Sequence, residues 1–271
     1  MIGLGIGVAR RPSSGGGAPA FDVDAAAFFA RVTAAGGTLS VAEQTATNQL
    51  VLDMKSAGIW SAMRAVYPMV GASAAACAQN LKSSSFTGTF TSGWTFASTG
   101  VTPNGTSAYM STGLSPSATF ASINSVSIGA YLNNTLSTPT GFMGSADTTV
   151  ANGIYLIVYF ADTSYNRMSS NITQVYSGIG STGGFFQISR INSTEFKYYK
   201  NSSLLNTATI NSSGLTSTNF DVGRTNYGNT AFEYGLGRYA FVYLADGFTT
   251  TEVNNLNTAV QAFQTTLSRQ V

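Results

Sequence analysis

Two short polar stretches combine tyrosine with asparagine and arginine, a mixture that suits a ligand rich in hydroxyl groups. They are residues 162–167 (DTSYNR) and residues 224–229 (RTNYGN). A tyrosine ring stacks on the face of a sugar ring, while asparagine and arginine form hydrogen bonds with sugar hydroxyls. An ordinary polar turn covered by a tyrosine explains the same letters, so both interpretations stay open. The candidate sugar-binding residues are Tyr165, Asn166, Arg167, Arg224, Asn226, Tyr227 and Asn229.

The commonest catalytic side-chain chemistries have little support in the composition. The 271 residues include no histidine, which excludes serine–histidine nucleophiles and histidine zinc sites. The single cysteine, Cys77, has no intrachain disulfide partner and is best interpreted as a small buried residue. Hydrolysis of a glycosidic bond needs two carboxylates about 5–10 Å apart, and the eleven acidic residues are scattered along the chain. We therefore expect no enzyme, with a pair of distant carboxylates as the alternative.

The charge balance argues against nucleic acid and membranes as partners. Only 9% of residues are charged and the net charge is +2, so no strong field attracts phosphate groups. The longest apolar run after the N-terminus, residues 154–161, is far shorter than the roughly 20 residues of a membrane-spanning helix. The apolar first nine residues precede Arg10 and Arg11, the reverse of a secretion signal, so we expect them to be retained.

The elements that would position these candidate residues begin, at the N-terminal end of the chain, with helices. Residues 1–20 are rich in glycine, serine and proline and predict a flexible arm. Residues 21–84 predict a helical hairpin, with Asp24 capping its first helix and a capping box of Ser40 and Glu43 opening the second. The segment around Pro68 is interpreted as a hinge that packs the hairpin on the main body.

Residues 85–248 change to short β-rich runs bounded by Gly, Asn, Ser and Thr, which favours an antiparallel sandwich. The alternation in residues 195–200 predicts a strand with one buried face, whereas residues 154–160 suit a central strand with two. Residues 249–271 predict an amphipathic helix opened by a capping box of Thr249 and Glu252. The predicted strands are residues 106–111, 125–132, 141–145, 153–160, 167–172, 185–191, 195–200, 204–210, 220–223 and 237–244.

Several of these runs resemble the laminin-G-like, concanavalin-like jelly roll. In order they are GFFQISR at 184–190, FKYYKNSSL at 196–204, FDVGR at 220–224 and GRYAFV at 237–242, although Ser202 stands where the family's hairpin has glycine. The resemblance implies a mainly β fold, an antiparallel jelly-roll sandwich with an N-terminal helical hairpin and a C-terminal amphipathic helix. The glucanase branch of that superfamily carries Glu-x-Asp-x-x-Glu on one strand, a spacing that this sequence lacks.

A second resemblance concerns the helical parts. Residues 28–40, 58–71 and 259–271 are similar to proteins of bacteriophages and prophage-like regions that join a helical hairpin to such a jelly roll. It implies a non-enzymatic virion protein (a fibre, spike, capsid or tail-associated part) assembled in the bacterial cytoplasm and bound to other virion proteins through its N-terminal arm and helices. It further implies an oligomer that binds host-surface glycan. A free carbohydrate-binding or glycan-cleaving domain is the alternative.

A calcium site and two arginines in predicted strands are the remaining candidate features. Many relatives hold calcium with loop oxygens; Asp162, Asp221 and Asp246 near strand ends are the possible ligands here, against the alternative of isolated surface or turn-capping acids. Arg190 and Arg238 fall inside apolar strands, which suggests an edge position or a buried ion pair, with a subunit interface as the functional alternative.

Overall fold

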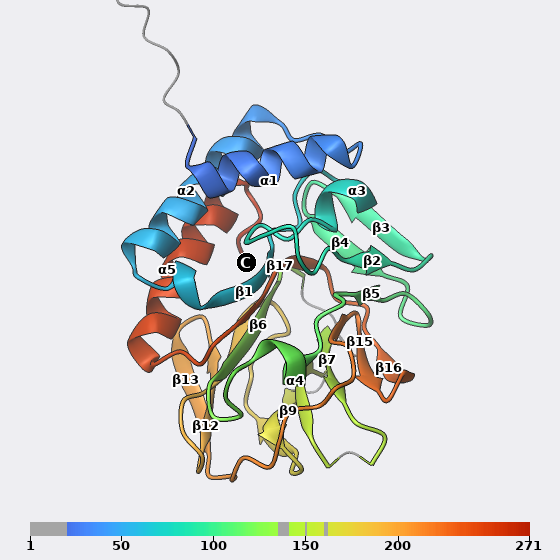
Figure 1. Ribbon diagram of the computed structural model, residues 1–271, viewed down its shortest axis with the longest axis vertical. Coiled ribbons are helices and arrows are strands. Elements are labelled where there is room, and N and C mark those ends of the chain that lie inside the picture. Colours follow the sequence, from blue (N-terminus) through green and yellow to red (C-terminus); the bar gives the residue numbers. More distant parts are fainter. Residues whose placement is uncertain (1–20, 135–140, 150, 160–161) are drawn as a thin grey trace, which may run out of the picture.

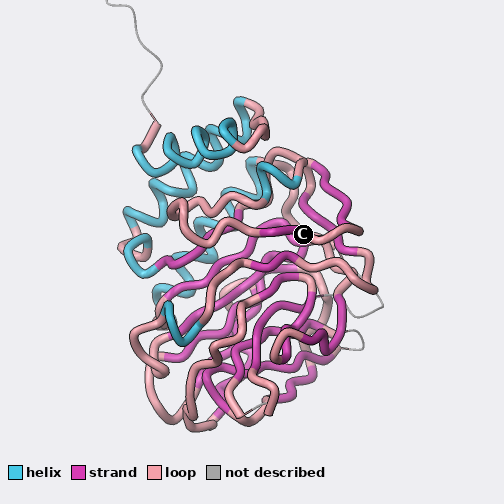
Figure 2. Tube along the Cα trace, turned by 45° about the vertical axis from the view of Figure 1, so that its right-hand side comes forward, coloured by secondary structure: helices cyan, strands magenta, loops and turns pink. Residues whose placement is uncertain are grey.

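The computed structural model describes residues 21–134, 141–149, 151–159 and 162–271, and it shows a layer of helices beside two stacked β-sheets (Figures 1 and 2). The arm predicted for residues 1–20 lies outside the described residues. None of the helices in the described ranges is long and apolar enough to cross a membrane. The helices are α1 (Val23–Ala34), α2 (Val41–Ser56), the 3₁₀ helix η1 (Trp60–Ala62), α3 (Ala74–Cys77), α4 (Pro116–Thr119) and α5 (Thr250–Thr266).

The long helices begin where side chains satisfy their first backbone amides. Both predicted capping boxes are confirmed: Ser40 and Glu43 open α2, and Thr249 and Glu252 open α5. The cap predicted for the first helix is wrong by two residues. Asp22, not Asp24, precedes α1 and accepts the amide of Asp24, because the helix begins two residues earlier than its apolar pattern suggests.

The first sheet has the strand order β13-β12-β11-β6-β17-β4-β3, and β1 pairs with the end of β17. All its pairings are antiparallel. Its strands are β1 (Met63–Tyr67), β3 (Trp94–Ala97), β4 (Gly100–Pro103), β6 (Val126–Leu132), β11 (Gly184–Arg190), β12 (Phe196–Lys200), β13 (Ser203–Ala208) and β17 (Tyr239–Ala245).

The second sheet has the order β10-β9-β8-β7-β14-β5-β2, with the hairpin of β15 and β16 attached to β7. The pairing of β15 with β7 is parallel, and the others are antiparallel. Its strands are β2 (Thr89–Phe90), β5 (Met110–Ser111), β7 (Gly141–Ala146), β8 (Gly153–Val158), β9 (Thr163–Ser170), β10 (Gln174–Ser177), β14 (Asp221–Val222), β15 (Arg224–Tyr227) and β16 (Thr230–Tyr234).

Two apolar clusters hold these layers together. Between the sheets, Ile128, Ile188 and Val242 of the first sheet pack with residues such as Leu156 and Met168 of the second. This is the expected core of a sandwich, formed by the inward side chains of alternating strands.

The second cluster joins the helices to the other face of the first sheet. Phe28, Leu50 and Phe263 from the helices share it with Phe185 and Phe241 from the strands. The rings of Phe241 and Phe263 lie edge to face with centroids 6.5 Å apart. The first sheet is therefore buried on both faces, and the sandwich and helices form one packed body.

Two expectations about this region are corrected by the structure. The supposed hinge contains β1, which extends the first sheet along β17. The strand of residues 196–200 is buried on both faces, with Tyr198 in the inter-sheet core and Tyr199 in the helical cluster. Its alternation indicated one buried face because the covering helix α5 lies far away in the sequence.

Arg190 lies in an interior strand, and among the residues that the structure describes no acid pairs with it. Its fully buried guanidinium donates hydrogen bonds to the carbonyl oxygens of Met168 (2.9 Å), Asn192 (3.2 Å) and Ile210 (2.8 Å), linking β11 to β9 of the facing sheet. Burial lowers the pKa of Arg190 to about 10. Arg238 precedes β17, and its backbone amide donates to the side chain of Asn134 at 2.7 Å.

Cys77 is buried, as predicted, at the end of α3. Its thiol donates to the carbonyl oxygen of Val70 at 3.3 Å, and burial raises its pKa to about 12. Together the two sheets, the N-terminal helices and the C-terminal helix confirm the predicted jelly-roll sandwich.

Candidate functional site

The outer face of the second sheet carries a groove of about 630 Å³, which we call the tyrosine groove. Its strands β7, β9, β15 and β16 lie in the lower half of Figure 1, away from the long helices. The apolar cluster beneath it includes no helical residue among those that the structure describes. The groove is lined by Phe142, Tyr155, Ile157, Tyr159, Tyr165, Arg167, Thr173, Val175, Tyr227 and Glu233.

The floor of the groove comes from alternate residues of three paired strands. Phe142 of β7 lies opposite Ile157 of β8, and Ile157 lies opposite Tyr165 of β9. Side chains at alternate positions of a strand point to the same face, so these partners form one row across the sheet. Phe142, Tyr155 and Ile157 are at most 3% exposed. They provide a rigid apolar base.

A glycine in β7 makes room for the floor tyrosine. Gly144 pairs with Tyr155 and has a φ of +146°, in the region that favours glycine. A Cβ atom at this position would collide with the side chain of Tyr155 and lie 2.5 Å from the carbonyl oxygen of Ile154. Gly144 thus allows β7 to approach the backbone of β8 closely at Tyr155.

Three further tyrosines form the walls. The ring of Tyr159 lies edge to face with those of Phe142 (6.2 Å between centroids) and Tyr165 (5.9 Å). Tyr227 lies against Tyr155, with centroids 6.1 Å apart. The walls thus present aromatic surface and phenolic hydroxyls to whatever enters.

One cation is built into the groove. The guanidinium of Arg167 lies 5.2 Å from the centroid of the Tyr155 ring and donates a hydrogen bond of 2.9 Å to the hydroxyl of Thr173. The hydroxyls of Tyr155 and Thr173 are hydrogen-bonded to each other as well. Arg167 is only 6% exposed. The arginine is therefore engaged by the protein and fixes the floor tyrosine.

The phenols of Tyr159 and Tyr227 stay protonated. Burial raises the pKa of Tyr227, and burial, the Glu233 carboxylate and Tyr165 together raise the pKa of Tyr159. At neutral pH both hydroxyls remain neutral groups that donate and accept hydrogen bonds.

A tight turn beside the groove holds Tyr227. Gly228 and Asn229 both have positive φ, 53° and 73°, between the paired residues Tyr227 and Thr230. Two consecutive positive values define the type I′ hairpin turn, which favours glycine and asparagine. The amide of Asn229 donates to the side chain of Asn226 at 2.9 Å. This turn fixes the end of β15 from which Tyr227 projects.

The structure brings three of the seven sequence-predicted site residues together in the tyrosine groove: Tyr165, Arg167 and Tyr227. Asn166 is buried on the opposite side of β9, where its amide donates to Ser164. Most of the two polar stretches is strand: residues 163–167 belong to β9 and residues 224–227 to β15. Neighbouring strand residues point to opposite faces, so Tyr165 and Asn166 do not face one ligand.

The other three predicted residues form part of the structure beside the groove. Arg224 pairs with the buried Asp221 at 2.7 Å, and its guanidinium lies 3.4 Å from the centroid of the Tyr109 ring. The side chain of Asn226 donates to the carbonyl oxygen of Asn219 at 2.9 Å, and Asn229 forms the turn described above.

The sequence analysis missed most of the groove. Phe142, Tyr155, Tyr159, Thr173 and Glu233 lie in or beside strands that were predicted only as core elements or not at all. A signal was present in the order Tyr155, Ile157, Tyr159, where large side chains recur every second residue and two of them carry a hydroxyl. That period places them on one face of a strand.

The three aspartates considered for calcium are not gathered. Asp246 pairs with Arg64, Asp221 with Arg224, and Asp162 accepts the amide of Gly180. Across the described residues there is no group of three or more His, Cys, Asp or Glu that could hold a metal ion.

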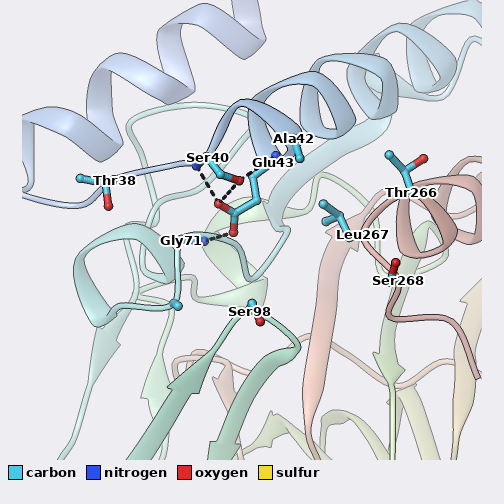
Figure 3. Close-up of a pocket in the computed structure, with 10 residues that line it drawn as sticks. Thr38, Ser40, Ala42, Glu43, Gly71, Ser98, Thr266, Leu267 and Ser268 are labelled. Atoms are coloured by element: carbon cyan, nitrogen blue, oxygen red, sulfur yellow. Dashed lines mark hydrogen bonds between the residues drawn. The ribbon is translucent and has the colours of Figure 1, made fainter.

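A second hollow, of about 490 Å³, lies between the start of α2 and the end of α5 (Figure 3). Its one carboxylate, Glu43, accepts hydrogen bonds from the amides of Ser40 (2.8 Å) and Gly71 (2.7 Å). The remaining lining is small or aliphatic, such as Thr38, Ser98 and Leu267. Because its carboxylate is used in capping the helix, this hollow offers little to a ligand.

No protein-family model matches the sequence, and no curated protein does. Among solved structures, the CBM40 of the Ruminococcus gnavus IT-sialidase shares 14% identity over 49% of this chain and 82% of its own, with a TM-score of 0.36. Domain 4 of AbnA, an extracellular arabinanase from Geobacillus stearothermophilus solved with arabinotriose, shares 14% over 72% of this chain and 98% of its own, with a TM-score of 0.41. Botulinum neurotoxin type C shares 12% over 76% of this chain and 53% of its own, with a TM-score of 0.49. These are likenesses of fold alone.

Proposed function

We propose that the protein binds a carbohydrate in the tyrosine groove and does not cleave it. The observation that carries this proposal is the concentration of aromatic side chains in an open groove on a rigid strand surface. Apolar C–H faces of a sugar ring pack on aromatic rings, while its hydroxyls need a few polar partners at the edges. The tyrosine hydroxyls, Thr173 and Glu233 are such partners.

Binding without hydrolysis is favoured by the acid content of the groove. Within the described lining, Glu233 is the one carboxylate. Both the retaining and the inverting mechanism of glycoside hydrolysis use a pair of carboxylates that flank the bond to be cleaved. A lone carboxylate beside neutral phenols suits hydrogen bonding to hydroxyls.

Replacing a wall tyrosine tests the proposal. A glycan array probed with the purified chain identifies a binding saccharide, and its affinity is then measured by calorimetry for Tyr165→Ala and Tyr227→Ala. We expect each variant to bind about tenfold more weakly, because each loses one stacking surface worth ~1.4 kcal/mol.

The matched control is Phe21→Ala, which removes an aromatic ring that is 40% exposed on the helical side of the molecule. It should bind as the parent chain does. Failure to bind any saccharide, or equal losses in all three variants, would refute the groove as a glycan site. Release of shorter saccharides from the bound glycan would show that the protein hydrolyses it, which would contradict binding without cleavage.

We further propose that the chain is part of a bacteriophage particle, assembled in the bacterial cytoplasm and attached through its N-terminal region. The support is the sequence resemblance of residues 28–40, 58–71 and 259–271 to virion-associated proteins. The long helices pack on the outer face of the first sheet and the tyrosine groove lies on the outer face of the second, which suits attachment at one side and glycan binding at the other. Peptide mapping of purified particles tests this, and absence of the chain from intact particles refutes it.

A further inference from the structure

The tyrosine groove contains two residues of opposite charge, Arg167 and Glu233, which differ in exposure and in their protein partners. Arg167 is 6% exposed, its guanidinium lies over Tyr155, and it donates to Thr173. Arg167 thus lines the groove, but little of its side chain is exposed and its guanidinium is engaged by protein partners.

Glu233 lies on the β16 side of the groove and is partly exposed. Within the described ranges, no side chain or amide donates a hydrogen bond to its carboxylate, and no cation pairs with it. Its negative potential reaches Tyr159, where it contributes to the raised pKa of that phenol. Of the two charges that line the groove, the carboxylate is therefore the more exposed to a ligand.

We propose that the tyrosine groove selects uncharged saccharides over carboxylated ones, and that Glu233 sets this selectivity. The inference rests on the proposed glycan-binding function. The Glu233 carboxylate accepts hydrogen bonds from the hydroxyls of a neutral sugar, which it binds as a charged acceptor. A uronic acid instead brings a second carboxylate close to it, and two like charges in a partly buried site repel.

The test uses saccharide triplets that differ only at C6: a hexose oligosaccharide, the corresponding hexuronic acid and the methyl ester of that acid. The parent chain should bind the hexose and the neutral ester at least about tenfold more tightly than the acid. Because the discrimination is electrostatic, it should shrink as the salt concentration rises.

Glu233→Gln identifies the residue responsible. Glutamine keeps a carbonyl acceptor of the same length but removes the charge, so affinity for the hexose and for the ester should fall together, while the difference between ester and acid falls below about threefold. The matched control is Glu195→Gln, which removes the same charge from a residue before β12 of the other sheet. It should leave the discrimination unchanged.

The outcomes test the selectivity set by Glu233 separately from glycan binding in the groove. If the acid binds as tightly as the ester, or if Glu233→Gln leaves the preference intact, the inference is overturned while glycan binding stands. If no member of any triplet and no array glycan binds, both are overturned.

Discussion

At the scale of single residues, the clearest feature is a buried arginine whose partners are carbonyl oxygens. Arg190 donates to backbone carbonyls of β9 and of two loops, and its guanidinium also lies 5.5 Å from the centroid of the Phe196 ring. A buried charge normally requires compensation by an acid or several hydrogen bonds. Here three carbonyl dipoles from separate segments supply it, so one side chain connects both sheets.

Arg190→Met should therefore lower the free energy of unfolding by about 2–4 kcal/mol, because the variant leaves three buried carbonyls without their donor. Urea denaturation followed by circular dichroism measures the change. Lys197→Met is the control; its side chain is 33% exposed and 3.9 Å from Glu195, so its effect should stay within ~0.5 kcal/mol. Equal stabilities of the two variants would contradict a clamping role for Arg190.

Residue types in the candidate site were predictable, but their orientation was not. Tyr165 and Arg167 share a face of β9 because they are two positions apart, and Asn166 between them points to the core. The sequence shows this alternation without showing which set faces outward. The partners Phe142 and Tyr155 depend on the register of β7 with β8, which no local pattern specifies.

At the scale of elements, the start of α1 is tied to α2 by charge. The Asp22 carboxylate accepts the Asp24 amide at 3.0 Å and the Lys55 ammonium at 2.6 Å. The hydrogen bond from Lys55 lowers the pKa of Asp22 below its ordinary value of 3.8, against the opposing effect of burial. Both contacts depend on the ionised carboxylate.

Acid should weaken this junction. The folded-state pKa of Asp22 is below the unfolded value, so the unfolded chain binds more protons between the two. The stabilisation is fully present above about pH 4 and is lost as pH falls through the folded pKa. Asp22→Asn keeps a good helix cap and removes the charge, so it should cost about 0.5–1 kcal/mol at pH 7 and progressively less below pH 4. Denaturant titrations from pH 7 to 2 measure this difference. A pH-independent difference would contradict the charge argument.

Elements with local signals were predictable, whereas those fixed by distant partners were not. The capping boxes at Ser40 and Thr249 gave the starts of α2 and α5 to the residue. Met63–Tyr67 looked like a hinge because Pro68 follows it, and it is a strand only because β17 offers a free side for pairing. The two-residue strand β2 is too brief for any periodicity to mark, and β5 and β14 are short parts of the longer strands predicted at residues 106–111 and 220–223.

At the scale of the whole molecule, helices and sandwich share one apolar cluster. The N-terminal helices contribute Phe28, Val32 and Leu50 to it, and α5 contributes Phe263. β1 continues the chain of the N-terminal helices directly into the first sheet. Separating the layers would expose the rings of Phe185 and Phe241 to water, at a large cost in free energy.

We therefore expect a single cooperative unfolding transition. In Trp94→Phe, Trp60 is the remaining tryptophan and reports on the helical layer, where it is 8% exposed. Its fluorescence and the far-ultraviolet circular dichroism of the strands should give coincident thermal curves. An earlier fluorescence transition, with the sheet signal unchanged, would mean that the helical hairpin folds as a separate unit.

The burial of Cys77 has a practical consequence for reagents that label thiols. The chain has no other cysteine, and a thiol with a pKa of about 12 is less than about one ten-thousandth thiolate at neutral pH. The native protein should therefore react little with maleimides or with disulfide reagents. A cysteine introduced at Val175, which lines the tyrosine groove and is 49% exposed, would take a fluorophore at one chosen point, so the entry of a ligand could be followed optically in the folded chain.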